Sequence, residues 1–228
     1  MQTFTSQIYF SNLKFTKIGK ESSFIDSWAQ PDYVKCHNLR AKRITGGRIN
    51  YLCTGNATNN QKQLKMIENT ALVLEGGGFR GMFTAGVLEV FLEQEITFES
   101  VYGVSAGAAY GASYISNQQG RNMAVNQYIG DKRYCSVGNL LRKGSLFSWE
   151  FIYEEIPQHI IPFDYDALKQ SASKFWVGAS NCETGKAEFF LLNDADKKEF
   201  KTILAASGSL PFIAPIVSYK DRLLLDGG

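Results

Sequence analysis

Ser105 is the residue of this chain whose surroundings point most directly to chemistry. It is the central residue of Gly103-Val104-Ser105-Ala106-Gly107, a GxSxG pattern that joins an apolar run, 98–104, to a helical pattern, 106–117. A serine at such a junction lies on a sharp turn with its hydroxyl exposed, and glycines on both sides remove side chains that would clash there. The pattern predicts a nucleophile elbow. The alternative interpretation of the pattern is a glycine-rich turn that serves packing alone.

A second glycine-rich segment, 76–81 (GGGFRG), fits GxGxxG, follows an apolar run at 71–75 and opens a helical pattern at 81–94. As a nucleotide-binding turn it would need an acid about 20 residues on, at the end of the next strand. Glu93, Glu95 and Glu99 lie in that range, but none closes a strand. As part of an acyl-transfer site, the loop would offer backbone N–H groups to an oxyanion, and Arg80 would add positive charge or anchor the loop. This second interpretation concerns Gly76, Gly77, Gly78, Arg80 and Gly81.

A serine nucleophile also needs a proton acceptor, which is usually histidine. His159 is the sole histidine after Ser105, and its amphipathic surroundings, 154–161, indicate a surface or core-edge residue. No histidine follows Asp226, so the Ser, acid, His order of an α/β-hydrolase is poorly supported. A carboxylate has to be considered as the base. Asp226 follows a strand pattern at 222–225, although an aspartate before glycine is also common in turns.

The elements that must position these residues follow from hydrophobic periodicity. Two strand-turn-helix units in succession, 71–94 and 98–117, predict parallel strands with helices packed over the sheet on both faces, an α/β layer fold. Strands are expected at 174–180 and 187–192, joined by a turn at 183–186, and a helix at 197–207. Two further strands are expected at 216–219 and 222–225.

The chain changes character before Met66. Residues 1–65 hold ten Lys or Arg against three acids, and residues 66–228 hold 14 against 19. We therefore expect a basic amino-terminal segment, 1–65, and one globular domain, 66–228. The segment has three interpretations: a basic arm on anionic lipid, a small accessory subdomain, or sequence upstream of a start at Met66. No nucleic-acid motif accompanies its charge, so we expect no nucleic-acid partner.

Composition narrows the remaining classes. The apolar runs are far shorter than the roughly 20 residues that span a bilayer, and the first residues lack the features of a secretory signal. We expect a cytoplasmic protein, with peripheral contact at a membrane left open. Four widely spaced cysteines and two histidines form no zinc or disulfide pattern, and no acidic cluster has calcium-loop spacing, so neither a metal nor a cofactor is expected.

In order and context, three segments resemble the signatures of patatin-like phospholipases, as found in bacterial patatin-domain proteins. They are GGGFRG, GVSAG and the closing Asp226-Gly227-Gly228. The stretch Ala206 to Pro211 also resembles the family's approach to its catalytic aspartate. The resemblance covers 70–228. Family domains usually continue beyond the third motif, so the resemblance leads us to expect a domain truncated at its carboxyl end.

The resemblance implies a serine acyl hydrolase with a Ser-Asp dyad. Ser105 would attack a lipid ester, Asp226 would accept and return its proton, and Gly77 and Gly78 with the Arg80 loop would stabilise the oxyanion. The expected substrate is a lipid or another ester. Two alternatives stay open: a nucleotide-binding module that uses the GxGxxG loop, and an inactive truncated homologue. Neither the substrate nor the oligomeric state follows from the sequence.

Overall fold

A computed structural model describes residues 65–228. By its contacts the chain divides into residues 1–62 and 63–228, and the sheet and helices below belong to the second unit. The basic segment predicted at 1–65 lies outside the described residues except for Lys65, which begins the first strand.

The sheet has six strands, and their places agree closely with the strands predicted from periodicity. They are β1 (Lys65–Leu74), β2 (Ile96–Val104), β3 (Lys174–Asn181), β4 (Ala187–Leu191), β5 (Val217–Tyr219) and β6 (Arg222–Asp226). β1 begins six residues before the predicted strand, and a register shift against β2 lies in this added part, between Ile67 and Ala71.

The helical elements include three that were predicted, namely α2, α3 and α7. Within residues 65–228 the helical elements are η1 (Gly78–Arg80), α2 (Gly81–Glu93), α3 (Ala106–Ile115), α4 (Arg121–Asn126), α5 (Val137–Lys143), η2 (Phe151–Ile160), α6 (Tyr165–Gln170) and α7 (Lys197–Ser207). η1 is a single 3-10 turn, and η2 is a π-helix that contains Pro157.

The predicted α/β fold is confirmed, with a sheet that is mixed rather than wholly parallel. β1, β2 and β3 are parallel, whereas β4 and β6 pair with β3 antiparallel and β5 pairs with β6 antiparallel. For β3–β4 and β5–β6 the reason is local, because short turns join these strands and a short turn can join only antiparallel neighbours. β3 and β6 are distant in the chain, so their pairing has no such local cause.

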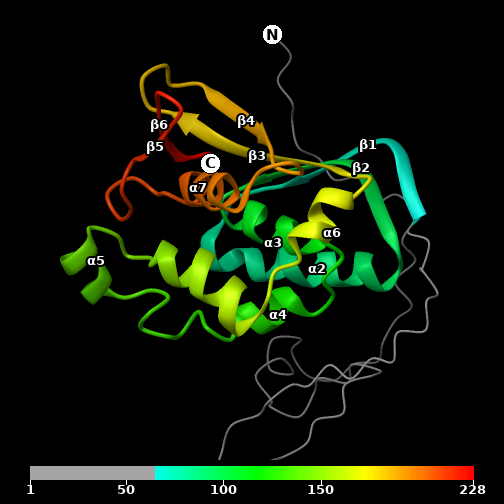
Figure 1. Ribbon diagram of the computed structural model, residues 1–228, viewed down its shortest axis with the longest axis horizontal. Helices are drawn as coiled ribbons and strands as arrows, with labels where there is room; N and C mark the ends of the chain where they lie inside the picture. The colour runs from blue at the N-terminus through cyan, green and yellow to red at the C-terminus, as the bar shows by residue number, and fades with distance from the viewer. Residues whose placement is uncertain (1–64) are drawn as a thin grey trace, which may run out of the picture. The chain divides into compact units, whose positions relative to one another are not determined.

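Helices were expected on both faces, and within residues 65–228 they pack on one face (Figure 1). Because β1, β2 and β3 follow one another across the sheet, right-handed crossovers place α2 and α3 on the same side. That side holds the core, where Leu88 of α2 and Ile203 of α7 are fully buried with Phe175 of β3. On the opposite face Val73 and Phe189 are 47% and 48% exposed.

β3 is the strand with which the strands that carry the predicted site residues pair. β4 occupies one edge of β3 along Trp176–Ser180. The other edge is therefore shared: β2 pairs with residues up to Gly178, and β6 pairs from Asn181 back to Ala179. The carboxyl ends of β2 and β6 thus approach each other along one edge of β3.

Candidate active site

Ser105 lies at the predicted elbow. It stands between β2 and α3 with φ 53° and ψ −123°, a region that non-glycine residues rarely occupy. Strain of this kind costs on the order of 1–3 kcal/mol and is concentrated at functional sites. The backbone thus has the geometry expected of a nucleophile elbow rather than of an ordinary helix start.

The flanking glycines make this turn possible. A Cβ on Gly107 would lie 2.3 Å from the carbonyl oxygen of Leu74, and a Cβ on Gly103 would lie 2.6 Å from the Cα of Ala108. Both contacts are with backbone atoms, which cannot rotate out of the way. The GxSxG spacing is therefore a packing requirement of the elbow against β1 and α3.

The glycine-rich loop runs beside the serine. A Cβ on Gly76 would lie 3.1 Å from the Cβ of Ser105. Gly78 has a positive φ of 53° and lines the same cavity as Ser105. Within residues 65–228 the amides of Gly77 and Gly78 donate no backbone hydrogen bond.

Two residues of the glycine-rich loop, Arg80 and Gly81, lie away from the cavity. Gly81 lets α2 pack on α3, because a Cβ there would lie 2.7 Å from the Tyr110 ring. The Arg80 side chain lies next to Gly77, and the residue is exposed and does not line the cavity. For a nucleotide-binding loop, the acid that should close the second strand is missing. β2 ends at Val104, and Glu99 in its middle accepts the Asn69 N–H (3.1 Å).

Asp226 ends β6 and is 6% exposed. Its Oδ1 accepts the Gly228 N–H (2.8 Å), and its Oδ2 is buried without a hydrogen-bond partner among the described residues. A buried oxygen of a carboxylate without a partner is costly, and such groups are often found where a ligand or a reaction uses them. The carboxylate makes no hydrogen bond to Ser105 in this structure.

The end of α7 holds both residues in place. The Ser105 N–H donates to Ser207 Oγ (2.8 Å), and the Ser207 hydroxyl donates to the Gly178 carbonyl (2.6 Å). Two residues further on, the Ser209 carbonyl accepts the Asp226 N–H (2.9 Å). Gly227 fits closely beside them, since its Cβ would lie 2.5 Å from the Gly178 oxygen and 3.1 Å from Val104 Cγ1.

A cavity of about 350 Å³ opens at Ser105 and is lined by helices and the loops that join them. Most of its wall is apolar, with residues from α3, η2 and α7 such as Ala109, Ile156 and Leu204. Four aromatic residues, Phe147, Trp149, Phe151 and Tyr153, alternate along the chain before and at the start of η2. Three of them line the cavity, and Phe151 is a core residue with 3% exposure.

Some site residues carried no recognised signal in the sequence. Ser207 lies within the stretch that resembles the family's approach to its aspartate, but its hydrogen bond to the elbow amide depends on how α7 ends. Arg121 also lines the cavity, donates to Ser113 Oγ (3.0 Å) and lies over the Phe163 ring. Burial lowers the pKa of Arg121 to about 10. His159 is exposed, as expected.

Among residues 65–228, no group of three or more His, Cys, Asp or Glu side chains could hold a metal ion. In the same part of the chain, no helix is long and apolar enough to cross a membrane.

The chain is similar in sequence to known proteins. The family described as Patatin-like phospholipase matches residues 72–228. An uncharacterized protein of Escherichia coli K12, YjjU, is 30% identical over 164 residues, which are 69% of this chain and 45% of YjjU. VipD from Legionella pneumophila, a crystal structure, aligns over 84% of this chain and 49% of its own with 12% identity and a TM-score of 0.36. The chain therefore spans less than half the length of either protein. The match over most of the chain shows that it belongs to the family of patatin-like phospholipases.

Proposed function

We propose that this chain is a carboxylic ester hydrolase that cleaves acyl esters of lipids through an acyl-enzyme on Ser105. The observation that carries the proposal is the strained serine of the elbow, which opens directly onto an apolar cavity. The cavity volume of about 350 Å³ falls within the range of about 300–1,000 Å³ that is usual for small-molecule sites. An apolar wall beside the nucleophile suits an acyl chain.

In the first half of the reaction, Ser105 Oγ attacks the ester carbonyl carbon while Asp226 takes the hydroxyl proton. The negative charge that develops on the carbonyl oxygen is met by the amides of Gly77 and Gly78. The tetrahedral intermediate then collapses, the carbon–oxygen bond to the alcohol breaks, and Asp226 returns the proton to the leaving alcohol. In the second half, water attacks the acyl carbonyl carbon while Asp226 accepts a proton from it. The bond to Ser105 Oγ then breaks, Asp226 returns the proton to Oγ, and the fatty acid is released.

The surroundings of Asp226 support its part as base. Oδ2 has no partner among the described residues, so it has a lone pair available for a proton. Tyr153 lies near enough to interact with this carboxylate: its pKa is raised by burial above all, and then by Tyr134 and Asp226. The phenol is therefore neutral and adds no negative charge beside Asp226 when the proton is transferred.

The glycine-rich loop should contribute strongly to the rate. Loss of one oxyanion donor typically costs about 100- to 1,000-fold in rate. The amides of Gly77 and Gly78 cannot be removed by side-chain substitution, but their direction can be changed. Gly78 has φ 53°, which a residue with a Cβ rarely adopts, so Gly78→Val would turn the loop and lower the turnover number.

The direct test is hydrolysis of p-nitrophenyl esters and phospholipids by the full chain and by Ser105→Ala. We expect turnover by the wild type and none above background by the variant. Ser218→Ala, an exposed serine of β5, is the matched control and keeps full activity. Equal and negligible turnover by all three proteins would contradict the proposal and favour an inactive homologue. Thermal stabilisation by NAD in such a protein would favour a nucleotide-binding module.

A further inference from the structure

Large apolar side chains are exposed around the mouth of the cavity. Phe79 and Leu210 line the cavity and are also 48% and 37% exposed, so they form part of its rim. Close to them in the chain, Phe83 is 80% exposed and Phe212 is 99% exposed. Single exposed apolar residues are ordinary, but several that gather at one site mark a surface that binds a partner.

The exposure of Phe212 is built into the backbone. Its φ is 70°, in the left-handed region that an aromatic residue rarely occupies. The turn is fixed on both sides, because the Leu210 carbonyl accepts the N–H groups of Ile213 (3.3 Å) and Ala214 (3.0 Å). A strained, hydrogen-bonded turn thus holds the ring in solvent. In that position the ring contributes no buried apolar area to the stability of the fold.

α5 adds a second exposed apolar group. None of its residues is buried, and Val137 and Leu141, one turn apart and so on one face, are 65% and 82% exposed. Arg142 and Lys143 follow at its carboxyl end. Apolar residues on one face with cations beside them are typical of helices that lie in a membrane interface.

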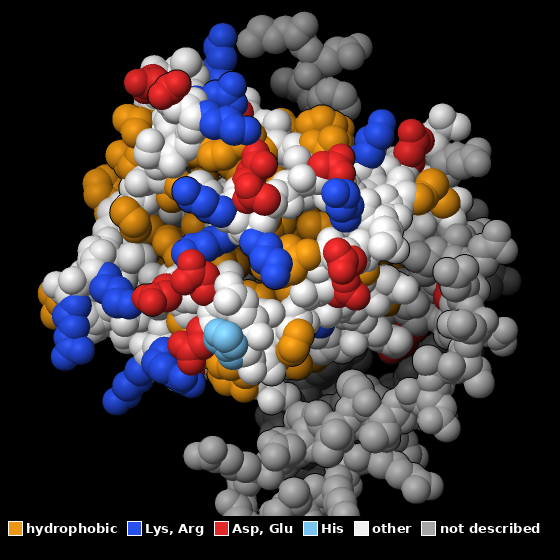
Figure 2. All heavy atoms as spheres, in the orientation of Figure 1, with side chains coloured by type: hydrophobic (Ala, Val, Ile, Leu, Met, Phe, Trp, Pro, Cys, Tyr) orange, Lys and Arg blue, Asp and Glu red, His pale blue; other side chains and the backbone are white. Residues whose placement is uncertain are grey.

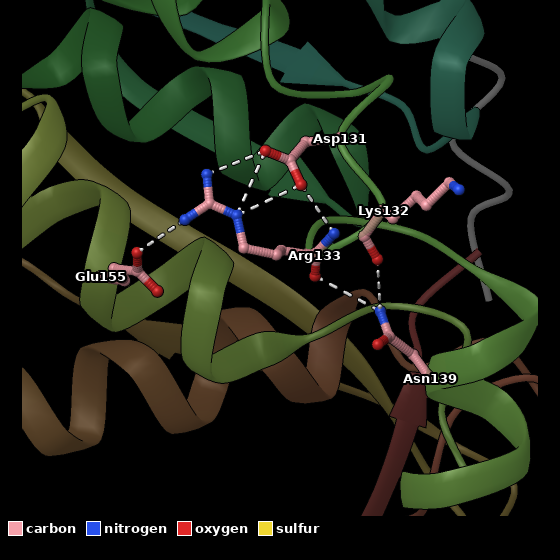
Figure 3. A network of polar contacts seen from close by, with 5 residues as sticks. All are labelled: Asp131, Lys132, Arg133, Asn139 and Glu155. Atoms are coloured by element: carbon pink, nitrogen blue, oxygen red, sulfur yellow. Dashed lines mark hydrogen bonds and ion pairs between the residues drawn. The ribbon is translucent and has the colours of Figure 1, made fainter.

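α5 is tied to the rim and to the body of the domain. The Leu146 N–H donates to the Ile213 carbonyl (2.7 Å), which joins the chain after α5 to the turn of Phe212. At the other end of α5, the Asn139 side-chain amide donates to the Lys132 and Arg133 carbonyls (3.3 Å each). Arg133 in turn pairs with Asp131 and Glu155 (Figure 3). The exposed face of α5 is therefore held in a fixed position.

The charge beside these apolar residues is positive. Lys132 and Arg142 are exposed and form no ion pair with another described residue. Figure 3 shows the Lys132 side chain pointing away from the Arg133 network. In Figure 2, hydrophobic and Lys or Arg side chains lie together at the left edge, the side where Figure 1 places α5. Cations at such an edge attract anionic lipid headgroups.

We propose that this surface, made of Val137, Leu141 and Phe212 with the cations Lys132 and Arg142, docks the protein on an anionic lipid bilayer. The purpose of the docking rests on the proposed hydrolase function. Phe79 and Leu210 would then meet the bilayer at the cavity mouth, and an acyl chain would pass from the membrane to Ser105 without crossing water. The substrate class is thereby an ester of packed lipid rather than a dispersed one.

The test is co-sedimentation of the full chain with phosphatidylcholine vesicles, with and without phosphatidylglycerol. The Ser105→Ala protein is used, so that no lipid is consumed. We expect binding that is stronger with phosphatidylglycerol and that falls about tenfold or more in Leu141→Ala/Phe212→Ala, because large apolar groups leave the interface. Lys132→Ala/Arg142→Ala should lose the preference for phosphatidylglycerol. The matched control is Phe189→Ala/Leu191→Ala on β4, because these side chains are 48% and 41% exposed and do not line the cavity.

The outcomes separate docking from hydrolysis. Absence of binding by the parent protein, or an equal loss in the β4 control, would overturn the docking surface even if soluble esters are hydrolysed. Binding that follows the Leu141/Phe212 pair in a chain that hydrolyses nothing would uphold the surface and refute the proposed function. In an active chain, the Leu141/Phe212 variant should keep its rate on p-nitrophenyl butyrate and lose rate on vesicles.

Discussion

Ser105 and Asp226, far apart in the chain, come to adjacent positions along one edge of β3. Val104, the residue before the serine, pairs with Gly178, and Asp226 pairs with Ala179. The parallel strand β2 and the antiparallel strand β6 thus end facing each other. This arrangement explains why the third motif is Asp-Gly: a side chain at Gly227 would meet the Gly178 oxygen at 2.5 Å.

Gly107→Ala should damage the elbow. The new Cβ would lie 2.3 Å from the Leu74 carbonyl oxygen and could be accepted only by a shift of β1 or α3. Overpacking of this kind costs about 1–3 kcal/mol, measurable as a lower midpoint in urea unfolding. Gly86→Ala in α2 is the control, because nothing lies within 4 Å of its Cβ. Its helix should gain about 0.5–1 kcal/mol. Equal stability of the two variants would contradict the packing role of Gly107.

Ser207→Ala tests whether the end of α7 positions the nucleophile. The substitution leaves the Ser105 N–H and the Gly178 carbonyl without their shared partner, at a cost of about 1–3 kcal/mol for each buried group left unpaired. We expect the turnover number to fall while KM stays nearly constant. Ser209→Ala, which removes a bond to the Ala205 carbonyl only, should keep the turnover number. A change in KM alone would argue against positioning.

The sequence predicted the parts of the fold that depend on local pattern. The strand-turn-helix units around Gly76 and Ser105 indicated β1, α2, β2 and α3 within a few residues, apart from the early start of β1. Alternation and turn residues indicated β4 and β6 as well. The elbow was predictable because its tight packing requires glycine at positions 103 and 107, and both glycines can be read in the sequence.

What the sequence could not predict depends on contacts between distant segments. Nothing local indicates that β6 shares an edge of β3 with β2, so the approach of Asp226 to Ser105 followed only from family resemblance. Ser207 looks like any serine at the end of a helix. The short helices α4, α5 and α6 have six or seven residues, too few for periodicity to stand out.

The cavity predicts a preference for acyl length. Ala109 lines the wall beside the elbow, so Ala109→Leu would fill space that a long acyl chain occupies. We expect kcat/KM for p-nitrophenyl decanoate relative to acetate to fall about tenfold, which corresponds to the loss of one or two buried methylenes. Ala187→Leu, exposed on β4, should leave the ratio unchanged. An equal loss for both esters would place the acyl chain elsewhere.

Glu199 should make the free energy of unfolding depend on pH. Its carboxylate accepts from the Tyr219 hydroxyl and then from Lys220 Nζ (3.0 Å), and these two bonds lower its pKa from the ordinary value. Because the unfolded chain then binds more protons, the contribution to stability is present above the ordinary pKa and is lost as pH falls through the lowered one.

Glu199→Gln should therefore lower the urea midpoint at pH 7 and leave it unchanged at a pH below the lowered pKa of Glu199. The side chain is 32% exposed, so we expect a difference below about 1 kcal/mol. Glu183→Gln, exposed in the β3–β4 turn, is the control. A loss of equal size at both values of pH would show that shape, rather than charge, makes the contribution.

The rate of labelling by a fluorophosphonate measures most directly whether the carboxylate of Asp226 activates Ser105. In the full chain, mass spectrometry should find the label on Ser105, and Asp226→Asn should label at least about 100-fold more slowly, as expected for loss of a general base. Asp221→Asn, in the turn before β6, should label at the wild-type rate. Labelling of Asp226→Asn at the wild-type rate would contradict the dyad.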